Sequence, residues 1–164
     1  MVEAHHDIKE IKEYAKLNNV PIMMTLANPN VKVTSIERDK ERYLEAVKNI
    51  KKLNLEDRIT LIFNDATDVE ITDKFDLIFI DAAKGKNMVF FEKFSKNLNP
   101  EGYIITDNIN FHGYVTMDEE QIKTRNLRGL VRKIKDYINF LKENDEYVTD
   151  FYEVGDGIAV STKK

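Results

Sequence analysis

One short run, Phe75–Ile80 with the sequence FDLIFI, constrains the fold of this chain more than any other stretch. It is mostly apolar and is followed at once by an acid, Asp81. Such a run predicts a buried strand of a parallel sheet, because these strands are covered on both faces. The next apolar strand, Tyr103–Thr106, also ends on an acid, Asp107. We therefore expect two carboxylates at the same edge of one sheet.

The rest of the chain alternates between strand patterns and helix patterns. The apolar residues 20–26 (VPIMMTL) fit either a strand or the joint between two pieces of chain. The tight-turn signal Gly155–Gly157 predicts an antiparallel hairpin at the end of the chain. The alternation predicts an α/β fold with right-handed crossovers and a mostly parallel sheet. The expected strands are 31–36, 58–63, 75–80, 103–106, 147–154 and 158–162, and the expected helices are 4–17, 39–53, 87–97 and 119–144.

The size and composition predict a single soluble domain. With 164 residues, 33% of them charged and 42% hydrophobic, the chain is ordinary for a globular protein. It has no cysteine, which excludes disulfides, thiolate catalysis and cysteine-bound zinc and fits a cytoplasmic location. No apolar run approaches the ~20 residues of a membrane span, and the N-terminus lacks a signal pattern. We therefore expect no membrane association.

The charge is unevenly distributed. A net charge of −4 does not point to a polyanionic partner for the whole surface. The helix expected at 119–144 nevertheless carries clustered basic side chains, which form either a solvated face or a patch that contacts phosphates. The basic residues in and beside this helix are Lys123, Arg125, Arg128, Arg132, Lys133 and Lys135.

Acids follow four of the expected strands, at the carboxyl ends where sheets of this class bind ligands. Glu37 follows the first strand and suits hydrogen bonds to ribose hydroxyls, or else caps the next helix. Asp65 follows the second strand and suits contact with an adenine amino group, or else serves as a turn residue. The other two acids are Asp81 and Asp107. Four acids at the ends of strands in one sheet predict a binding site.

Asp81, Asp107 and the neighbouring Asn108 supply two carboxylates and an amide oxygen, which suit a hard divalent cation. The alternative is that they form a turn and a helix cap. Lys84 could act as a base near such a cation, hold an oxyanion, or be a surface lysine. His112 follows in the loop after Asp107 and suits either substrate contact or a structural hydrogen bond.

Four motifs together resemble one enzyme family: TSIERD, IFIDAAKGK, IITDNINFHG and the closing VGDGIAVSTKK. They are similar to class I S-adenosylmethionine-dependent O-methyltransferases of the cation-dependent catechol and caffeoyl-CoA type. The likeness is closest to small bacterial members, including those that methylate 5-hydroxyuridine in the tRNA anticodon. It covers residues 31–164, and residues 4–23 also resemble the N-terminal helix and PIM segment of the family. The resemblance implies a Rossmann-like class I methyltransferase sheet.

The resemblance also implies roles for single residues. Asp81, Asp107 and Asn108 match the Mg²⁺ ligands, and Lys84 matches the candidate catalytic base. In such a site the cation lowers the pKa of the acceptor hydroxyl, and the oxyanion attacks the sulfonium methyl in line. The residues that the resemblance places at the S-adenosylmethionine cofactor are Glu37 at the ribose, Asp65 and Ala66 at the adenine, and Asp81.

One part of the family pattern is missing. The family has a strand that ends in a glycine-rich turn of the EIGTAIGYS kind before its TSIERD-like strand. Here Met23 continues directly into MTLANPN, and no glycine precedes Gly85. The first central strand, the glycine-rich turn and its following helix are therefore absent. This leaves three explanations: a natural or engineered deletion that costs methyl transfer, replacement of the strand by VPIMMTL or by a partner chain, or a stretch omitted from the sequence.

These observations predict an O-methyltransferase with impaired cofactor binding. The expected acceptor is 5-hydroxyuridine in tRNA, and a small hydroxylated aromatic of the catechol type is the alternative. A non-catalytic methyltransferase scaffold that only binds a partner or a metal is a further possibility. Loss of a central strand leaves the edges of its neighbours unpaired, which favours association. We therefore expect a homodimer.

Overall fold

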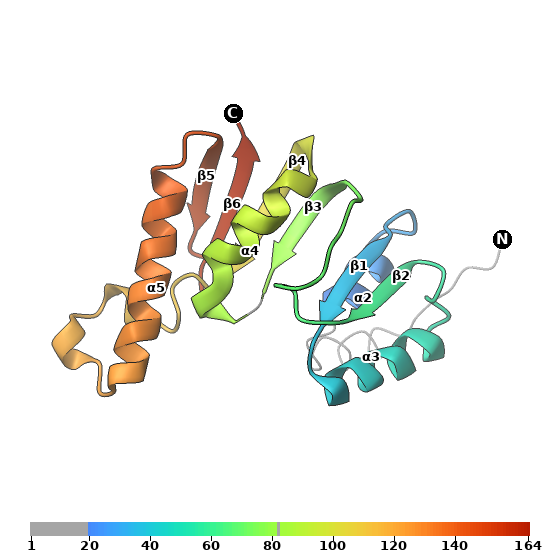
Figure 1. Cartoon of the computed structure of the whole chain (residues 1–164), viewed down its shortest axis with the longest axis horizontal. Coiled ribbons are helices and arrows are strands. Elements are labelled where there is room, and N and C mark those ends of the chain that lie inside the picture. The colour runs from blue at the N-terminus through green and yellow to red at the C-terminus, as the bar shows by residue number, and fades with distance from the viewer. Residues whose placement is uncertain (1–19, 82) are drawn as a thin grey trace. The chain divides into compact units, whose positions relative to one another are not determined.

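The computed structural model describes residues 20–81 and 83–164 (Figure 1). The chain divides into two compact units, residues 1–69 and residues 70–164, and each unit contains its own hydrogen-bonded sheet. The helix expected at 4–17 lies outside the described residues. The sequence predicts one mostly parallel sheet, whereas the structure has two hydrogen-bonded sheets, because the central strand that would join them is missing.

The first unit is built on two parallel strands. Val33 lies opposite Ile59, and the register continues to Glu37 opposite Phe63. Asp39 caps the helix between the strands, because its Oδ1 accepts a hydrogen bond of 2.9 Å from the backbone amide of Arg42. The elements of this unit are α2 (Val20–Ala27), β1 (Val33–Glu37), α3 (Lys40–Lys52) and β2 (Ile59–Phe63).

The apolar segment VPIMMTL, which we considered as a replacement for the missing strand, is helical and forms α2. Pro21 is tolerated because it lies in the first turn, where a missing amide hydrogen costs nothing. Arg58 then holds the segment that leads from α2 to β1. Its Nη2 donates to the carbonyl oxygens of Thr25 (2.7 Å), Asn28 (2.5 Å) and Val31 (3.0 Å). The replacement of the strand by VPIMMTL is therefore wrong for this structure.

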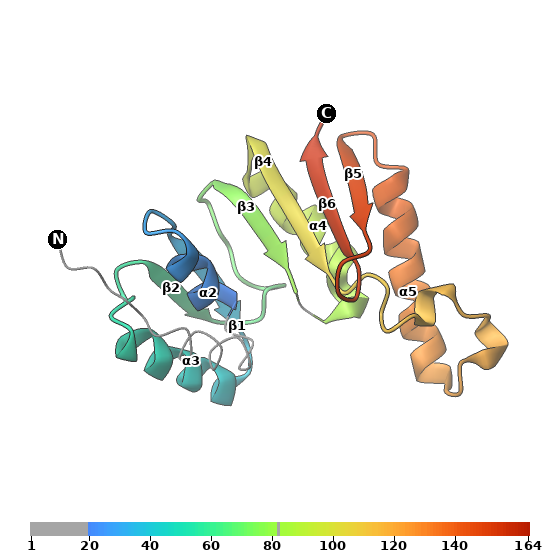
Figure 2. The same ribbon diagram turned by 180° about the vertical axis from the view of Figure 1, so that it is seen from behind.

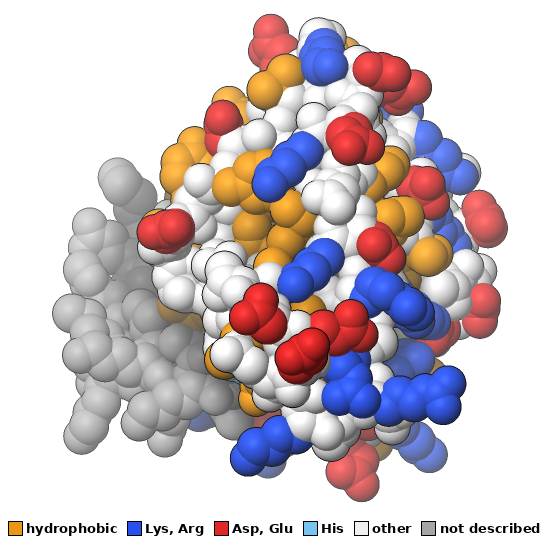
Figure 3. Space-filling view, turned by 90° about the vertical axis from the view of Figure 1, so that its left-hand side faces the viewer, with side chains coloured by type: hydrophobic (Ala, Val, Ile, Leu, Met, Phe, Trp, Pro, Cys, Tyr) orange, Lys and Arg blue, Asp and Glu red, His pale blue; other side chains and the backbone are white. Residues whose placement is uncertain are grey.

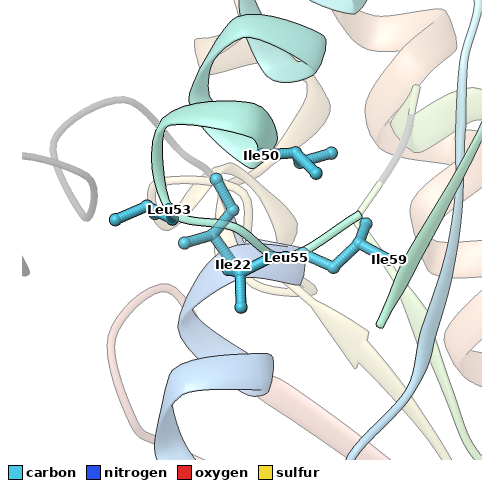
Figure 4. Packing of buried hydrophobic residues seen from close by; sticks show 5 residues of the cluster. All are labelled: Ile22, Ile50, Leu53, Leu55 and Ile59. Carbon is cyan, nitrogen blue, oxygen red and sulfur yellow. The ribbon is translucent and has the colours of Figure 1, made fainter. Parts of the chain in front are cut away.

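The core of the first unit is small. Ile22 of α2 packs with residues from α3 and from the approach to β2 (Figure 4). The buried members of the cluster are Ile22, Ile50, Leu53, Leu55 and Ile59.

The second unit contains a four-stranded sheet in the order β3-β4-β6-β5. β3 and β4 are parallel, whereas β6 is antiparallel to both β4 and β5. The predicted C-terminal antiparallel hairpin and the Rossmann-like α/β class are both confirmed. The main elements are β3 (Phe75–Ile80), α4 (Asn87–Phe94), β4 (Leu98–Asp107), α5 (Arg125–Lys142), β5 (Tyr147–Tyr152) and β6 (Ile158–Lys163).

Aromatic residues fill the core of the second unit. The Phe91 ring of α4 meets the rings of Tyr137, Phe140 and Tyr147 edge to face, with centroids 5.2–6.2 Å apart. The Tyr137 hydroxyl shares a buried 2.7 Å hydrogen bond with the Thr106 hydroxyl. Burial raises the pKa of Tyr137 far above its usual value, and the hydrogen bond with Thr106 offsets only part of this effect.

Several boundaries differ from the prediction, and two of them differ by five residues or more. The long helix begins at Arg125 rather than at 119, because Thr124 caps it by accepting a 3.2 Å hydrogen bond from the Leu127 amide. The 3-10 turn η4 (Glu119–Gln121) precedes this cap. β4 begins at Leu98 rather than at 103, so residues 98–102 lie inside the strand. No helix within residues 20–81 and 83–164 has both the length and the apolar character to cross a membrane.

Candidate functional site

One lysine contacts the ends of two neighbouring strands in the second unit. β3 and β4 are paired up to Ile80 opposite Thr106, so Asp81 and Asp107 follow neighbouring strand ends. Lys84 lies in the 3-10 turn η1 (Lys84–Lys86) that follows β3. Its Nζ donates to Oδ1 of Asp81 at 3.0 Å and to the backbone carbonyl of Asp107 at 3.3 Å. The structure therefore brings Asp81, Lys84 and Asp107 together.

The Lys84 side chain is only 16% exposed, whereas that of Asp81 is 37% exposed. An ammonium group in this position offsets the negative charge of the Asp81 carboxylate at short range. An ammonium has three N–H donors, so Lys84 can also donate to an acceptor oxygen of a ligand. The arrangement suits a group that holds a negative oxygen or, after losing its proton, accepts one.

The backbone bends sharply after Asp107. Oδ1 of Asp107 accepts a 2.7 Å hydrogen bond from the amide of Asn108, whose φ of 57° is left-handed. Phe111 and His112 also have positive φ values, 45° and 54°, before Gly113 at 79°. Strained backbone of this kind costs free energy and collects at binding sites.

The loop is held by the final hairpin. The backbone amide of His112 donates to Oδ1 of Asp156 at 2.6 Å, and its Nδ1 lies 3.5 Å from Oδ2 of the same carboxylate. These contacts support a structural role for His112 rather than substrate contact. Its side chain is nevertheless 76% exposed.

The predicted metal ligands fit a hard cation in their chemistry. Asp81, Asp107 and Asn108 offer only oxygen donors, from two carboxylates and one amide. Within the described residues, no group of three or more His, Cys, Asp or Glu side chains is placed to hold a metal ion. A cation at this position would therefore depend on the Asn108 oxygen and would share Asp81 with Lys84.

The strand-end acids of the first unit are engaged in a different way. Oε1 of Glu37 accepts a 2.7 Å hydrogen bond from the amide of Asp39. Asp65 accepts from Nη1 of Arg38 at 3.0 Å through Oδ2, and from the amide and hydroxyl of Thr67 at 2.9 and 2.8 Å through Oδ1. These carboxylates hold the turns in which they lie, and Ala66 is fixed inside the Asp65 turn.

Three residues at or beside the site are not indicated by any sequence pattern. Arg38 directly follows Glu37, but its ion pair with Asp65 depends on the pairing of β1 with β2. Asp156 lies in the GDG turn, which predicted only a hairpin. Lys133 of α5 lies against the Lys84 turn: a Cβ built on Gly85 would lie 3.4 Å from Cδ of Lys133 and 3.8 Å from its Nζ. Only the three-dimensional arrangement reveals these contacts.

The basic side chains of α5 divide into two groups. Arg128 donates to the carbonyl of Ile122 at 2.6 Å and Lys135 donates to the carbonyl of Met117 at 3.4 Å, so both hold the preceding loop. Lys and Arg side chains gather over the lower part of the surface in Figure 3, with acidic side chains among them. The exposed members of the basic series are Lys123, Arg125, Arg132 and Lys133.

Known proteins match nearly all of this chain. The model of a family described as O-methyltransferase matches residues 5–164. An Arabidopsis thaliana protein, provisionally named a caffeoyl-CoA O-methyltransferase, is 29% identical over 134 residues, which are 79% of this chain and 57% of that protein. The flavonoid 3',5'-methyltransferase of Vitis vinifera is 29% identical over 138 residues, which are 79% of this chain and 58% of that protein. The chain thus spans less than two thirds of these two relatives.

The chain is also similar to solved structures of proteins described as O-methyltransferases. A Staphylococcus aureus protein, provisionally described as a caffeoyl-CoA O-methyltransferase, is 31% identical with a TM-score of 0.81, over 95% of this chain and 82% of that chain. An O-methyltransferase from Bacillus cereus, solved in complex with SAH, is 26% identical with a TM-score of 0.69, over 81% of this chain and 63% of that chain.

Proposed function

This chain belongs to the O-methyltransferase family, and we propose that it transfers a methyl group from S-adenosylmethionine to a hydroxyl that has a second oxygen beside it. The observation that carries this proposal is the Lys84 ammonium between the Asp81 carboxylate and the end of β4. Oxygen ligands and a donor at one sheet edge suit an acceptor with two neighbouring oxygens.

On the acceptor side, Asp81, Asp107 and Asn108 would hold Mg²⁺, which when bound lowers the pKa of an acceptor hydroxyl. Lys84 would stabilise, as an ammonium, the oxygen that becomes negative. Alternatively, Lys84 would first give one proton to solvent and then, as a neutral amine, accept the proton of the hydroxyl. Its low exposure keeps it near the strand ends, where it can orient the acceptor.

On the donor side, Glu37 would accept hydrogen bonds from the ribose hydroxyls of the cofactor. Its Oε1 already accepts the Asp39 amide, which fixes the carboxylate in place, and a carboxylate can accept several hydrogen bonds. Asp65 would act mainly by fixing Ala66 beside the adenine, since both of its oxygens bind Arg38 and Thr67.

The acceptor that we propose first is 5-hydroxyuridine in tRNA, methylated in the cytoplasm. Exposed Arg125, Arg132 and Lys133 could contact phosphates, and Lys133 lies beside the turn that carries Lys84. A small hydroxylated aromatic is the second candidate. The flavonoid 3',5'-methyltransferase among the relatives favours it, as does the structural role of Arg128 and Lys135.

Titration calorimetry with S-adenosylmethionine, with and without Mg²⁺, tests the proposal. We expect binding that strengthens with Mg²⁺ in the wild type, and loss of Mg²⁺ binding with a retained fold in Asp107→Ala. Asp150→Ala, which removes an exposed acid from β5, is the matched control and should change neither. Absence of cofactor binding would support a non-catalytic scaffold instead, for which the missing glycine-rich turn is the motivation. An unchanged Mg²⁺ affinity in Asp107→Ala would mean that the metal lies elsewhere.

Salt dependence separates the two acceptors. Binding of an RNA anticodon stem-loop should weaken steeply with salt and should weaken further in Arg132→Ala. Arg132 is the sharper choice, because Arg128 also holds the Ile122 carbonyl and its loss would disturb the loop. RNA binding that is independent of salt and of Arg132 would remove the tRNA proposal and leave the small aromatic.

A further inference from the structure

The turn between β5 and β6, residues 154–157, contacts the loop that follows β4, and we call it the closing turn. In Figure 2 this turn lies at the end of the sheet where β4 also ends. The amide of Ile109 donates to the carbonyl oxygen of Gly157 at 3.1 Å, and the amide of Asn110 donates to that of Asp156 at 2.9 Å. These two backbone hydrogen bonds hold the loop against the closing turn.

Asn108 lies between two points at which the chain is held. Asp107 is the last residue of β4 and lies opposite Ile158. The residue before Ile158 is Gly157, and its carbonyl accepts from Ile109 rather than from Asn108. Asn108 is therefore an extra residue on its side of the pair, as in a β-bulge, and its left-handed φ of 57° agrees with such a bend. Bulges beside binding sites change the direction of a side chain.

The side chain of Asp156 serves the loop and not its own turn. An aspartate in a turn commonly accepts a hydrogen bond from an amide of the same turn. Here the backbone closes the turn, with a 3.0 Å hydrogen bond from the Gly157 amide to the Val154 carbonyl. Oδ1 of Asp156 instead accepts the His112 amide at 2.6 Å, and its buried Oδ2 lies 3.5 Å from Nδ1 of His112. A carboxylate that is only 18% exposed costs free energy unless it finds donors, and the loop supplies them.

Gly157 allows the loop to come close. A Cβ built on Gly157 would lie 2.6 Å from Cγ of Asn110 and 2.7 Å from its Nδ2, which is closer than side chains pack. Gly155 in the same turn also has a left-handed backbone, with φ 61° against 82° for Gly157. A Cβ on Gly155, however, would meet no atom of the described residues within 4 Å. Both positions favour glycine for the backbone, and Gly157 must also be small.

We propose that Asp156 and Gly157 are positioning residues of the candidate site. They hold the backbone after Asn108, while the pairing of Asp107 with Ile158 holds it before Asn108, so that the amide oxygen of Asn108 keeps one direction toward a cation. This inference rests on the proposed function, in which Asn108 is a metal ligand. Groups that orient a ligand without binding the metal contribute roughly 10–100-fold to metal affinity, so the effect should be measurable.

Titration calorimetry with Mg²⁺ on the full chain tests the proposal. We expect the dissociation constant for Mg²⁺ to rise about tenfold or more in Asp156→Ala and in Gly157→Ala. Asp156→Asn keeps an oxygen that can accept the His112 amide, so it should restore most of the affinity. Gly155→Ala is the matched control for Gly157. Glu153→Ala, which removes an exposed acid beside the closing turn, is the matched control for Asp156. Neither control should change the dissociation constant.

Thermal unfolding separates this positioning role from a purely structural one. Gly155→Ala and Gly157→Ala should both lower the melting temperature, because alanine is strained at a positive φ, but only Gly157→Ala should weaken Mg²⁺ binding. Circular dichroism checks that each variant is folded at the temperature of the titration. Loss of stability with wild-type Mg²⁺ affinity in Asp156→Ala and Gly157→Ala would overturn the proposal, and so would an equal loss of affinity in Gly155→Ala. A wild-type chain that binds no Mg²⁺ would overturn the proposed metal site itself, and this inference with it.

Discussion

The two units place acids at strand ends by the same topological rule, but they use them differently. In the second unit Lys84 joins the Asp81 carboxylate to the end of the neighbouring strand. In the first unit the carboxylates of Glu37 and Asp65 bind the amides of their own turns, and Asp65 also binds Arg38. A strand-end acid is therefore not a site by itself. The difference lies in the charged partner: Lys84 is only 16% exposed and also reaches the end of the neighbouring strand, whereas Arg38 is 64% exposed.

The units also differ in how their folds are stabilised. The second unit has a sheet covered by α4 and α5, with Leu141 and Tyr137 both 1% exposed. The first unit has a five-residue buried cluster and depends on Arg58 to hold the segment between α2 and β1. We infer that packing dominates in the second unit and that polar contacts carry a larger share in the first.

The largest effect should come from the core of the second unit. Leu141→Ala should lower the free energy of unfolding by about 2–5 kcal/mol, because it removes a fully buried side chain and leaves a cavity. Native-state hydrogen exchange, resolved by unit, is the measurement. Leu44→Ala on α3, where the side chain is 55% exposed, is the control and should change stability by less than about 0.5 kcal/mol. Equal loss of protection in both units would show that they unfold as one and do not differ in how they are stabilised.

The second largest effect should come from removing the hydrogen bonds of Arg58, which we call the Arg58 clamp. Arg58→Ala should destabilise the first unit by about 1.5–3 kcal/mol, because the carbonyls of Thr25, Asn28 and Val31 lose a charged donor. Hydrogen exchange of the amides in α2 and β1 is the measurement. Arg58→Lys keeps the charge but not the planar fork, and should recover only part of the loss. Full recovery by lysine would mean that charge alone holds the segment.

The buried hydroxyl pair should have a smaller effect. Tyr137→Phe should cost about 1–2 kcal/mol, because the Thr106 hydroxyl loses its partner in the core. Since burial raises the pKa of Tyr137 in the folded state, its contribution is fully present below the unfolded pKa near 10 and is lost as pH rises above it. Denaturation at neutral and alkaline pH should therefore show the wild type losing more stability than Tyr137→Phe. Parallel pH profiles would contradict this account.

The smallest effect should come from the exposed ion pair of the first unit. Arg38→Ala should change stability by no more than about 1 kcal/mol, because Arg38 is 64% exposed and water screens its contact with Asp65. Thermal unfolding at low and high salt is the measurement, and the difference between the wild type and the variant should shrink as salt rises. A larger, salt-independent loss would mean that the Arg38 contact is as important as the Arg58 clamp.

Sequence patterns predicted the local features of the fold. The predicted bounds of β3 agree with the structure, and so does the closing hairpin, because each depends on adjacent residues. α2 was ambiguous because its apolar run has no clear period, and the start of α5 was misplaced because a 3-10 turn stands before the Thr124 cap. The contacts of Asp65 with Arg38 and of Gly85 with Lys133 could not be predicted, since they join segments far apart in the sequence.

The left-handed backbone after β4 has a consequence for which sequence changes this loop can accept. Asn108 combines a φ of 57° with the amide oxygen proposed as a ligand, so two separate demands favour the same residue. A β-branched residue there would meet steric strain before any chemistry was affected, whereas glycine would keep the turn and remove only the oxygen. Position 108 therefore accepts few residues, because one requirement is a positive φ and the other is a side-chain oxygen. Asn108→Gly keeps the first and removes the second.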